Sequence, residues 1–199
     1  MIQSPSAHLV KWSKFISNLF NPMTSLLIYF ALFSLKNSTF RDAMHQLVPM
    51  LSLTVVPIFG WLFWQVRKGN YTDADVSNRQ QRKGLYFVIA AVLVVYLSYT
   101  YLRTSVVDIV ISFLLLLLIL LQLSNYFIKS SMHTAFNLFV SALLFTVNVF
   151  AAALWLGITF LVALSRLVLR RHTSAEILSG MAIATFVSIV FLLTYSNQL

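Results

Sequence analysis

Histidine and arginine are the side chains of this protein with the most scope for chemistry. The 199 residues include four His, fourteen Lys and Arg, five Asp and Glu, and no Cys. A chain without cysteine has no disulfide, no Cys-ligated zinc or iron–sulfur centre and no thiol nucleophile. Any reaction at this protein must therefore use His, carboxylate, Ser or Arg side chains.

Two of the four histidines, His133 and His172, each border a predicted membrane helix and have Ser or Arg close by. His8 and His45 fall in a predicted tail and loop, and we assign them no role. A neutral imidazole can attack phosphorus, a protonated one can donate to the departing oxygen, and guanidinium groups can hold the equatorial oxygens. No metal ion or cofactor is expected, since arginine would supply the positive charge.

Arginine stands near both predicted site segments. Arg166 precedes His172 by six positions, and Arg79 and Arg82 lie in the most highly charged loop. Arg170–Arg171 adjoin His172, and we interpret them as anchors of a helix end at the membrane surface rather than catalytic groups.

Glu176 follows His172 by four positions, so the two would share one face of a helix that starts there. In that position the carboxylate could fix the tautomer of the imidazole and raise its basicity. The segment Thr173–Glu176 also has the spacing of a capping box, in which Glu176 only satisfies an amide at the helix start. The orienting role is favoured, and the two roles can coexist.

The composition indicates the elements that must position these residues. The chain is 59% hydrophobic, 15% aromatic and only 10% charged, with a mean hydropathy of +0.85. These values exclude a soluble globule and predict an all-α, polytopic transmembrane helical bundle. Uncharged stretches near spanning length cover Phe15–Leu35, Gln46–Val66, Leu85–Leu102, Ile109–Phe127, Thr134–Ser165 and Ile177–Tyr195.

The stretch Thr134–Ser165 is too long for one span, and we expect a helical hairpin that turns near Phe150–Gly157. This hairpin gives seven spans, with six as the alternative. No repeat or linker divides the chain, so residues 1–199 are interpreted as one transmembrane helical domain, with the site-bearing core at about 73–180.

The net charge of +9 comes from basic residues at the ends of apolar segments, so membrane lipids and not nucleic acid are the expected partners. We expect an integral membrane protein of a bacterial inner membrane. Alternating spans put eleven of the fourteen basic residues on one face, which the positive-inside rule assigns to the cytoplasm. Those residues are Lys11, Lys14, Arg67, Lys68, Arg79, Arg82, Lys83, Lys129, Arg166, Arg170 and Arg171, against Lys36, Arg41 and Arg103.

Three segments together resemble the signatures of the type 2 phosphatidic acid phosphatase superfamily of membrane lipid phosphatases. Ser165–Glu176 is similar to the third signature, which reads S-R, five residues, H, three residues, D. Ser130–His133, with the letters SSMH, stands where the second signature has P-S-G-H. Asp73–Lys83 resembles a divergent form of the first, K, six residues, R-P, with Asp75 in place of Lys and Lys83 in place of Pro.

This resemblance implies roles for individual side chains. His172 would be the nucleophile that forms a phosphohistidine, and His133 would protonate the leaving group. Glu176 would orient His172. The phosphoryl oxygens would be held by Arg166, Arg82 and Ser131, with Arg79 and Lys83 as further cations that bind the substrate.

The resulting hypothesis is a membrane lipid phosphatase that hydrolyses a phosphomonoester or pyrophosphate of a prenyl, glycerolipid or saccharolipid phosphate. Two alternatives stay open at this stage. One is a catalytically degenerate member that binds or transports lipid headgroups, and the other is a lipid phosphotransferase in which another hydroxyl replaces water. The membrane face of the site is also open, because the resembling family commonly works on the outer face.

Overall fold

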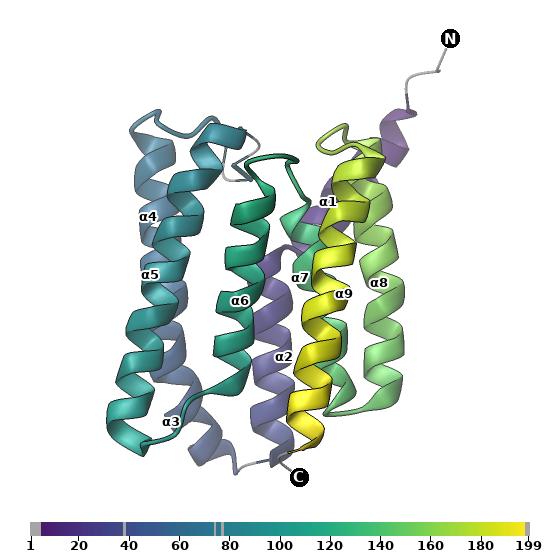
Figure 1. Cartoon of the computed structure of the whole chain (residues 1–199). Helices are drawn as coiled ribbons and strands as arrows, with labels where there is room; N and C mark the ends of the chain where they lie inside the picture. The colour runs from purple at the N-terminus through teal and green to yellow at the C-terminus, as the bar shows by residue number, and fades with distance from the viewer. Residues whose placement is uncertain (1–4, 38, 74, 77, 198–199) are drawn as a thin grey trace. The chain divides into compact units, whose positions relative to one another are not determined.

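The computed structural model describes residues 5–37, 39–73, 75–76 and 78–197. Within these ranges it contains nine α-helices, one π-helical segment and no strand, which confirms the predicted all-α class (Figure 1). The chain forms two compact units. Unit 1 comprises Met1–Phe33 and Ile128–Leu199, and unit 2 comprises Ser34–Phe127. That the whole chain acts as one domain stays a prediction.

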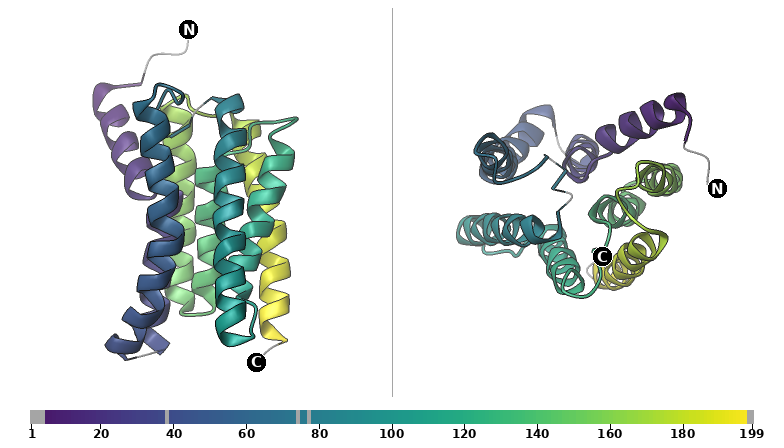
Figure 2. Two further views of the ribbon diagram at one scale, coloured as in Figure 1. Left: turned by 90° about the vertical axis from the view of Figure 1, so that its left-hand side faces the viewer. Right: turned by 90° about the horizontal axis from the view of Figure 1, so that it is seen from above.

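Unit 1 is a bundle in which α7 occupies the middle. It contains α1 (Ala7–Leu19), most of α2 (Pro22–Asn37), α7 (Met132–Phe145), α8 (Val149–Val168) and α9 (Ser174–Ser196). Helix α7 packs against both α8 and α9, and α1 packs against α8 (Figure 2). Most of α7 is buried, as expected of a helix that is apolar on nearly all sides.

A break between α1 and α2 bends the chain by 51°. Pro22 opens α2, where its missing N–H is no loss and its fixed φ suits the first helical turn. The Asn21 side-chain oxygen accepts hydrogen bonds from the amides of Met23 and Thr24, both at 3.0 Å. Pro22 therefore starts a new helix after the bend.

The hairpin expected in Thr134–Ser165 exists, but the predicted turn at Phe150–Gly157 is wrong. Helix α7 ends at Phe145 and α8 begins at Val149, so Phe150–Gly157 is helical. The reason is local, because the Asn148 side chain accepts from the Ala151 amide at 3.0 Å and caps α8.

In unit 2 a continuous helix of 28 residues, Phe40–Arg67, contains α3 (Phe40–Met50), the π-helical segment η1 (Leu51–Val55) and α4 (Val56–Arg67). Pro49 and Pro57 flank η1 closely. Each proline removes one helical N–H and crowds the carbonyl four residues earlier, and a π-turn is one way in which a helix absorbs this crowding. The Thr54 hydroxyl donates to the Met50 carbonyl at 2.6 Å within this segment.

Unit 2 continues with α5 (Arg79–Thr104) and α6 (Ile109–Ser124), which are antiparallel neighbours. Ser105 ends α5 in a left-handed conformation, with φ of 55°. Asp108 caps α6 by accepting from the Ile111 amide at 3.0 Å. Caps at both ends of this short connection explain why the two helices reverse direction there.

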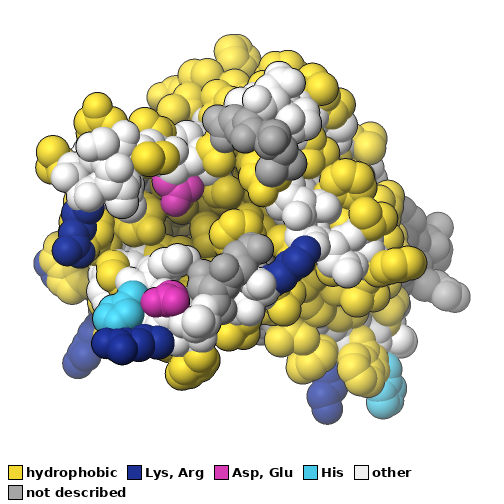
Figure 3. Space-filling model, turned by 90° about the horizontal axis from the view of Figure 1, so that it is seen from below, with side chains coloured by type: hydrophobic (Ala, Val, Ile, Leu, Met, Phe, Trp, Pro, Cys, Tyr) yellow, Lys and Arg dark blue, Asp and Glu magenta, His cyan; other side chains and the backbone are white. Residues whose placement is uncertain are grey.

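Four helices of the described residues are long and apolar enough to cross a membrane, and the bent pair α1–α2 could provide a fifth. The four are Phe40–Arg67, Arg79–Thr104, Val149–Val168 and Ser174–Ser196. Helices α6 and α7 are apolar but shorter. Apolar side chains cover most of the surface visible in Figure 3. These features are compatible with an integral membrane protein, although the length criterion gives fewer spans than predicted.

Candidate functional site

The start of α9 brings His172 and Glu176 into contact. The His172 Nδ1 lies 2.9 Å from Glu176 Oε2, which also accepts from the Thr173 amide at 3.1 Å. The Thr173 hydroxyl accepts from the Glu176 amide in return, at 3.3 Å, and completes the capping box. The Glu176 carboxylate therefore both caps α9 and contacts the His172 ring. In a neutral imidazole, this contact favours the tautomer that carries its proton on Nδ1 and its lone pair on Nε2.

Helices α7 and α9 meet at an unusually close backbone contact. The Ser131 amide donates to the Glu176 carbonyl at 3.0 Å. A Cβ at Gly180 would lie 2.7 Å from the Ser131 carbonyl oxygen, so only glycine permits this approach. His133 follows Ser131 by two positions in the first turn of α7. Both predicted histidines thus lie at the same end of unit 1, where α7 and α9 begin.

The two serines before α7 hold this end together. Ser131 Oγ lies 3.4 Å from the Thr134 amide, which donates to it, and 3.0 Å from the Thr134 hydroxyl, so Ser131 caps α7. Ser130 Oγ lies 2.7 Å from Ser179 Oγ on α9. Both Ser130 and Ser131 are buried. Ser131, a predicted phosphate ligand, thus contributes its amide and its hydroxyl to the structure of this end.

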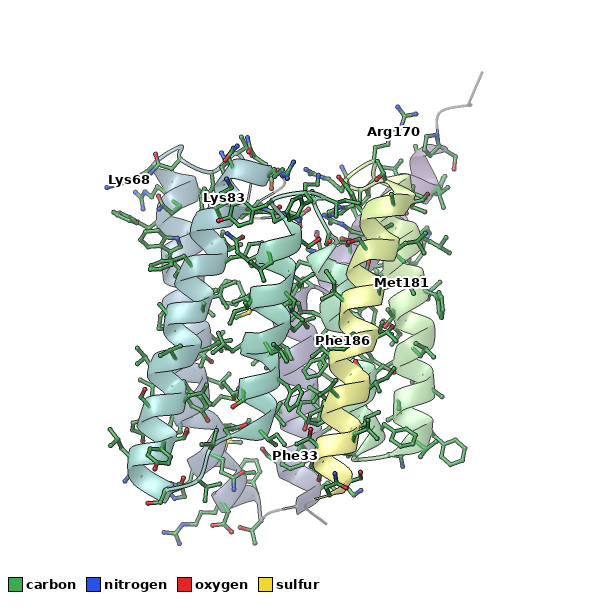
Figure 4. All side chains as sticks on the ribbon, in the orientation of Figure 1. Phe33, Lys68, Lys83, Arg170, Met181 and Phe186 are labelled. Carbon is green, nitrogen blue, oxygen red and sulfur yellow. The ribbon has the colours of Figure 1, made fainter. Side chains whose placement is uncertain are left out.

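Arg166 lies in the last turn of α8 and is only 2% exposed. Its Nη1 donates to the hydroxyl of Ser17 on α1 at 3.0 Å. The Arg171 amide donates to the Arg166 carbonyl, also at 3.0 Å, and closes a short loop towards His172. Arg170 in this loop is exposed, with φ of 52°, and extends from the end of the unit (Figure 4). Its exposure agrees with a surface anchor.

Lys129 is a site neighbour that the sequence analysis did not select. Its Nζ donates to the Arg171 carbonyl at 3.0 Å and lies 4.0 Å from Glu176 Oε2. The sequence feature that could have identified Lys129 is its position directly before Ser130–His133. Lys129 therefore adds positive charge beside the carboxylate that holds His172.

Asn137 is a second residue that the sequence analysis missed. Its Oδ1 accepts from Ser25 Oγ at 2.9 Å and from Trp155 Nε1 at 3.2 Å. Its Nδ2 donates to the Phe20 and His133 carbonyls, both at 2.8 Å. The amide is fully buried and uses its complete hydrogen-bonding capacity. A polar side chain in an apolar stretch, one helical turn after His133, was the available signal.

Unit 2 contains the other predicted phosphate-binding cations. Arg79 Nε donates to the Asn125 carbonyl at 2.6 Å, and the Asn125 side-chain amide donates to the Arg79 carbonyl at 3.3 Å. Arg82, which is buried, donates from Nε to the Val76 carbonyl at 3.0 Å. Val76 has φ of 46°, a costly conformation for a β-branched residue. The Arg82 bond therefore helps to hold a strained loop.

Lys83 lies at the same end of unit 2, with its Nζ 5.0 Å from the centre of the Tyr126 ring. Lys68 makes a similar contact with Trp64, at 4.0 Å. Figure 4 labels both lysines at the end of the unit that carries the charged loop. Arg79, Arg82 and Lys83 are thus gathered where α5 begins and α6 ends, as their spacing on one helical turn requires.

Within the described ranges, no three His, Cys, Asp or Glu side chains converge as ligands for a metal ion. No family model, curated protein or solved structure matches this chain. The chemistry of the site is therefore argued from its own geometry.

Proposed function

We propose that this protein is a metal-independent membrane lipid phosphatase of the type 2 phosphatidic acid phosphatase superfamily. The observation that carries the proposal is the 2.9 Å contact between His172 Nδ1 and Glu176 Oε2. In the tautomer that this contact favours, Nε2 carries the lone pair that attacks phosphorus. Support also comes from the starts of α7 and α9, which meet at one end of unit 1, because helix N-termini favour anions such as phosphate.

In the first half-reaction, His172 Nε2 attacks the phosphorus of a lipid phosphate in line with the departing oxygen. The N–P bond forms as the P–O bond to the lipid breaks, and His133 donates a proton to the lipid oxygen. Glu176 stabilises the positive charge that develops on His172, and Arg166 binds the phosphoryl oxygens.

In the second half-reaction, water attacks the phosphohistidine. His133 takes one proton from the water, the N–P bond breaks, and inorganic phosphate leaves with the imidazole of His172 restored. The protonated His133 is then ready for the next lipid. Atoms and charge balance without a metal ion or cofactor.

The substrate is a lipid phosphate or pyrophosphate whose tail stays in the bilayer between apolar helices. This proposal includes seven membrane crossings, with α1–α2 as a bent span and the shorter α6 and α7 as crossing helices, in a bacterial inner membrane. The phosphate-binding role of Arg79, Arg82 and Lys83 stays a prediction from the sequence.

The test is phosphate release from prenyl, glycerolipid and saccharolipid phosphates by purified protein in EDTA. His172→Ala should lose at least about a thousandfold in rate, because the nucleophile is gone, and His133→Ala about a hundredfold or more. His45→Ala, which removes an exposed imidazole, is the matched control and should keep wild-type activity. Release by His172→Ala at the wild-type rate would refute the proposal, as would the absence of activity on every lipid.

A second candidate function is headgroup binding without hydrolysis. It is favoured by the contacts of Ser131, because this predicted ligand of the reacting phosphoryl group is already bonded within the protein. Its amide and hydroxyl are bonded to Glu176 and Thr134, groups of the protein itself. Labelled lipid phosphate separates the candidates. An enzyme yields an acid-labile phosphohistidine that is absent from His172→Ala, whereas a binder retains the lipid in both proteins. Adding candidate hydroxyl acceptors and analysing the product separates a phosphotransferase from a hydrolase.

A further inference from the structure

Helix α1 has two chemically different faces. The face towards α8 carries small polar residues, Ser13 and Ser17, which are buried, and Ser17 holds Arg166. Small residues allow close packing of one helix on another. This face of α1 therefore packs within unit 1.

The opposite face of α1 is exposed and combines apolar and basic side chains. Trp12 is 62% exposed and Phe15 56%, and Leu19 is also exposed. Lys11 and Lys14 are exposed between them, and no Asp or Glu occurs from Ala7 to Leu19. Tryptophan beside lysine is typical of a helix at the boundary between headgroups and acyl chains.

The inclination of α1 agrees with such a boundary position. It makes an angle of 51° with α2. Seen along the bundle of unit 1, α7, α8 and α9 are viewed nearly end-on, whereas α1 runs across the view (Figure 2). A helix that continued α2 without this bend would run along the other helices of unit 1 and not across their direction.

We propose that the outer face of α1 binds the anionic surface of a phospholipid leaflet. The aromatic side chains insert at the headgroup level, and Lys11 and Lys14 bind the phosphate groups of anionic lipids. Charge complementarity identifies this partner, because an exposed face with two cations and no acid is attracted to a negative surface. Since Ser13 and Ser17 lie on the other side, α1 binds lipid while it stays packed on α8.

The absence of native cysteine allows one specific label on this face. Asn18 is exposed and lies seven positions after Lys11, on the same stripe of the helix. Asn18→Cys protein, carrying a polarity-sensitive dye, is titrated in mixed micelles with phosphatidylglycerol or phosphatidylcholine. We expect a saturable blue shift of the dye with phosphatidylglycerol only.

In the same labelled background, Lys11→Gln/Lys14→Gln should need about 30-fold more phosphatidylglycerol for half-saturation. Lys11→Arg/Lys14→Arg should behave as wild type, which separates loss of charge from loss of folding. Arg67→Gln/Lys68→Gln removes the same charge from an exposed segment of unit 2 and should leave the titration unchanged.

The proposal is overturned if phosphatidylcholine gives the same response, if the Gln pair on α1 titrates as wild type, or if the Arg67/Lys68 pair shifts the curve equally. Phosphate release is no part of this measurement, so the lipid-binding role of α1 and the proposed enzyme activity are tested separately.

Discussion

Replacing Asn137 by leucine tests whether one buried amide holds the site end of unit 1 together. Leucine has a similar volume but removes all four side-chain hydrogen bonds, to Ser25, Trp155, Phe20 and His133. The Phe20 carbonyl, the Ser25 hydroxyl and the Trp155 indole then lose these partners, whereas the His133 carbonyl keeps its main-chain bond in α7.

The expected loss follows from the number of bonds. Buried side-chain hydrogen bonds in membrane proteins average about 0.6 kcal/mol, so four contribute about 2 kcal/mol. Three polar groups left without these bonds, two of them on buried residues, add further cost, and we expect a total loss of about 3 kcal/mol in the free energy of unfolding. The loss should be large because the Phe20 carbonyl lies at the break between α1 and α2, where no helical amide follows to replace Asn137.

The assay is equilibrium unfolding in mixed micelles, followed by circular dichroism. Ser141→Ala is the matched control one turn further along α7. Its hydroxyl makes a single bond, to the Ala152 carbonyl at 2.9 Å, and its loss should cost about 0.6 kcal/mol. If Asn137→Leu is no less stable than Ser141→Ala, the amide is not the connection between the α1–α2 bend, α7 and α8 that its contacts indicate.

Two further predictions concern a glycine contact and a helix cap. Gly180→Ala should destabilise unit 1 and lower activity, because its Cβ would come 2.7 Å from the Ser131 carbonyl oxygen. Gly157→Ala should be neutral or stabilising by up to about 1 kcal/mol, because its Cβ would meet no atom within 4 Å beyond its chain neighbours and the backbone of its own helix. Thermal unfolding of both variants checks this, and equal melting temperatures would contradict it. Burial raises the pKa of the Asp108 carboxyl, so this side chain contributes stability that is complete below its usual pKa and is lost as the pH rises through the raised pKa. Asn also caps helices without a charge, so wild type should gain stability relative to Asp108→Asn as the pH falls from 7 towards 4, and parallel unfolding curves across that range would show the reasoning to be wrong.

The contacts predicted correctly from the sequence are short in range. The pair His172 and Glu176 and the capping box around Thr173 follow from i, i+4 and i, i+3 spacing in one helical turn, and both are present in the structure. The turn between α7 and α8 was predicted too far along the chain. The Asn148 cap alone sets the start of α8, and the apolar residues around it give no other indication of a turn. Composition and periodicity therefore predict the long apolar helices well and the ends of helices less well. The assignment of His8 to a tail and His45 to a loop was wrong, because α1 and α3 contain them.

Contacts between distant segments were beyond prediction from one sequence. The partner of Arg166 is Ser17, 149 positions away, and Asn137 joins Phe20 and Ser25, which lie 117 and 112 positions away. Serine and asparagine are common in many helices, so nothing in their type identifies which of them will meet. Only the packing of α1 on α8 and of α7 against its neighbours selects these pairs.

The amino-acid sequence alone determined that this chain is helical, apolar enough for a membrane, and equipped with His172 and Glu176 one helical turn apart. Those properties depend on composition and on the periodicity of a single helix, and both can be read from consecutive residues. The tertiary structure decided that Gly180 lets α9 touch the start of α7, that a serine of α1 holds Arg166, and that Asn137 joins three segments. Such contacts exist only when helices pack, because the free energy that stabilises them comes from van der Waals contact and hydrogen bonds between neighbouring helices.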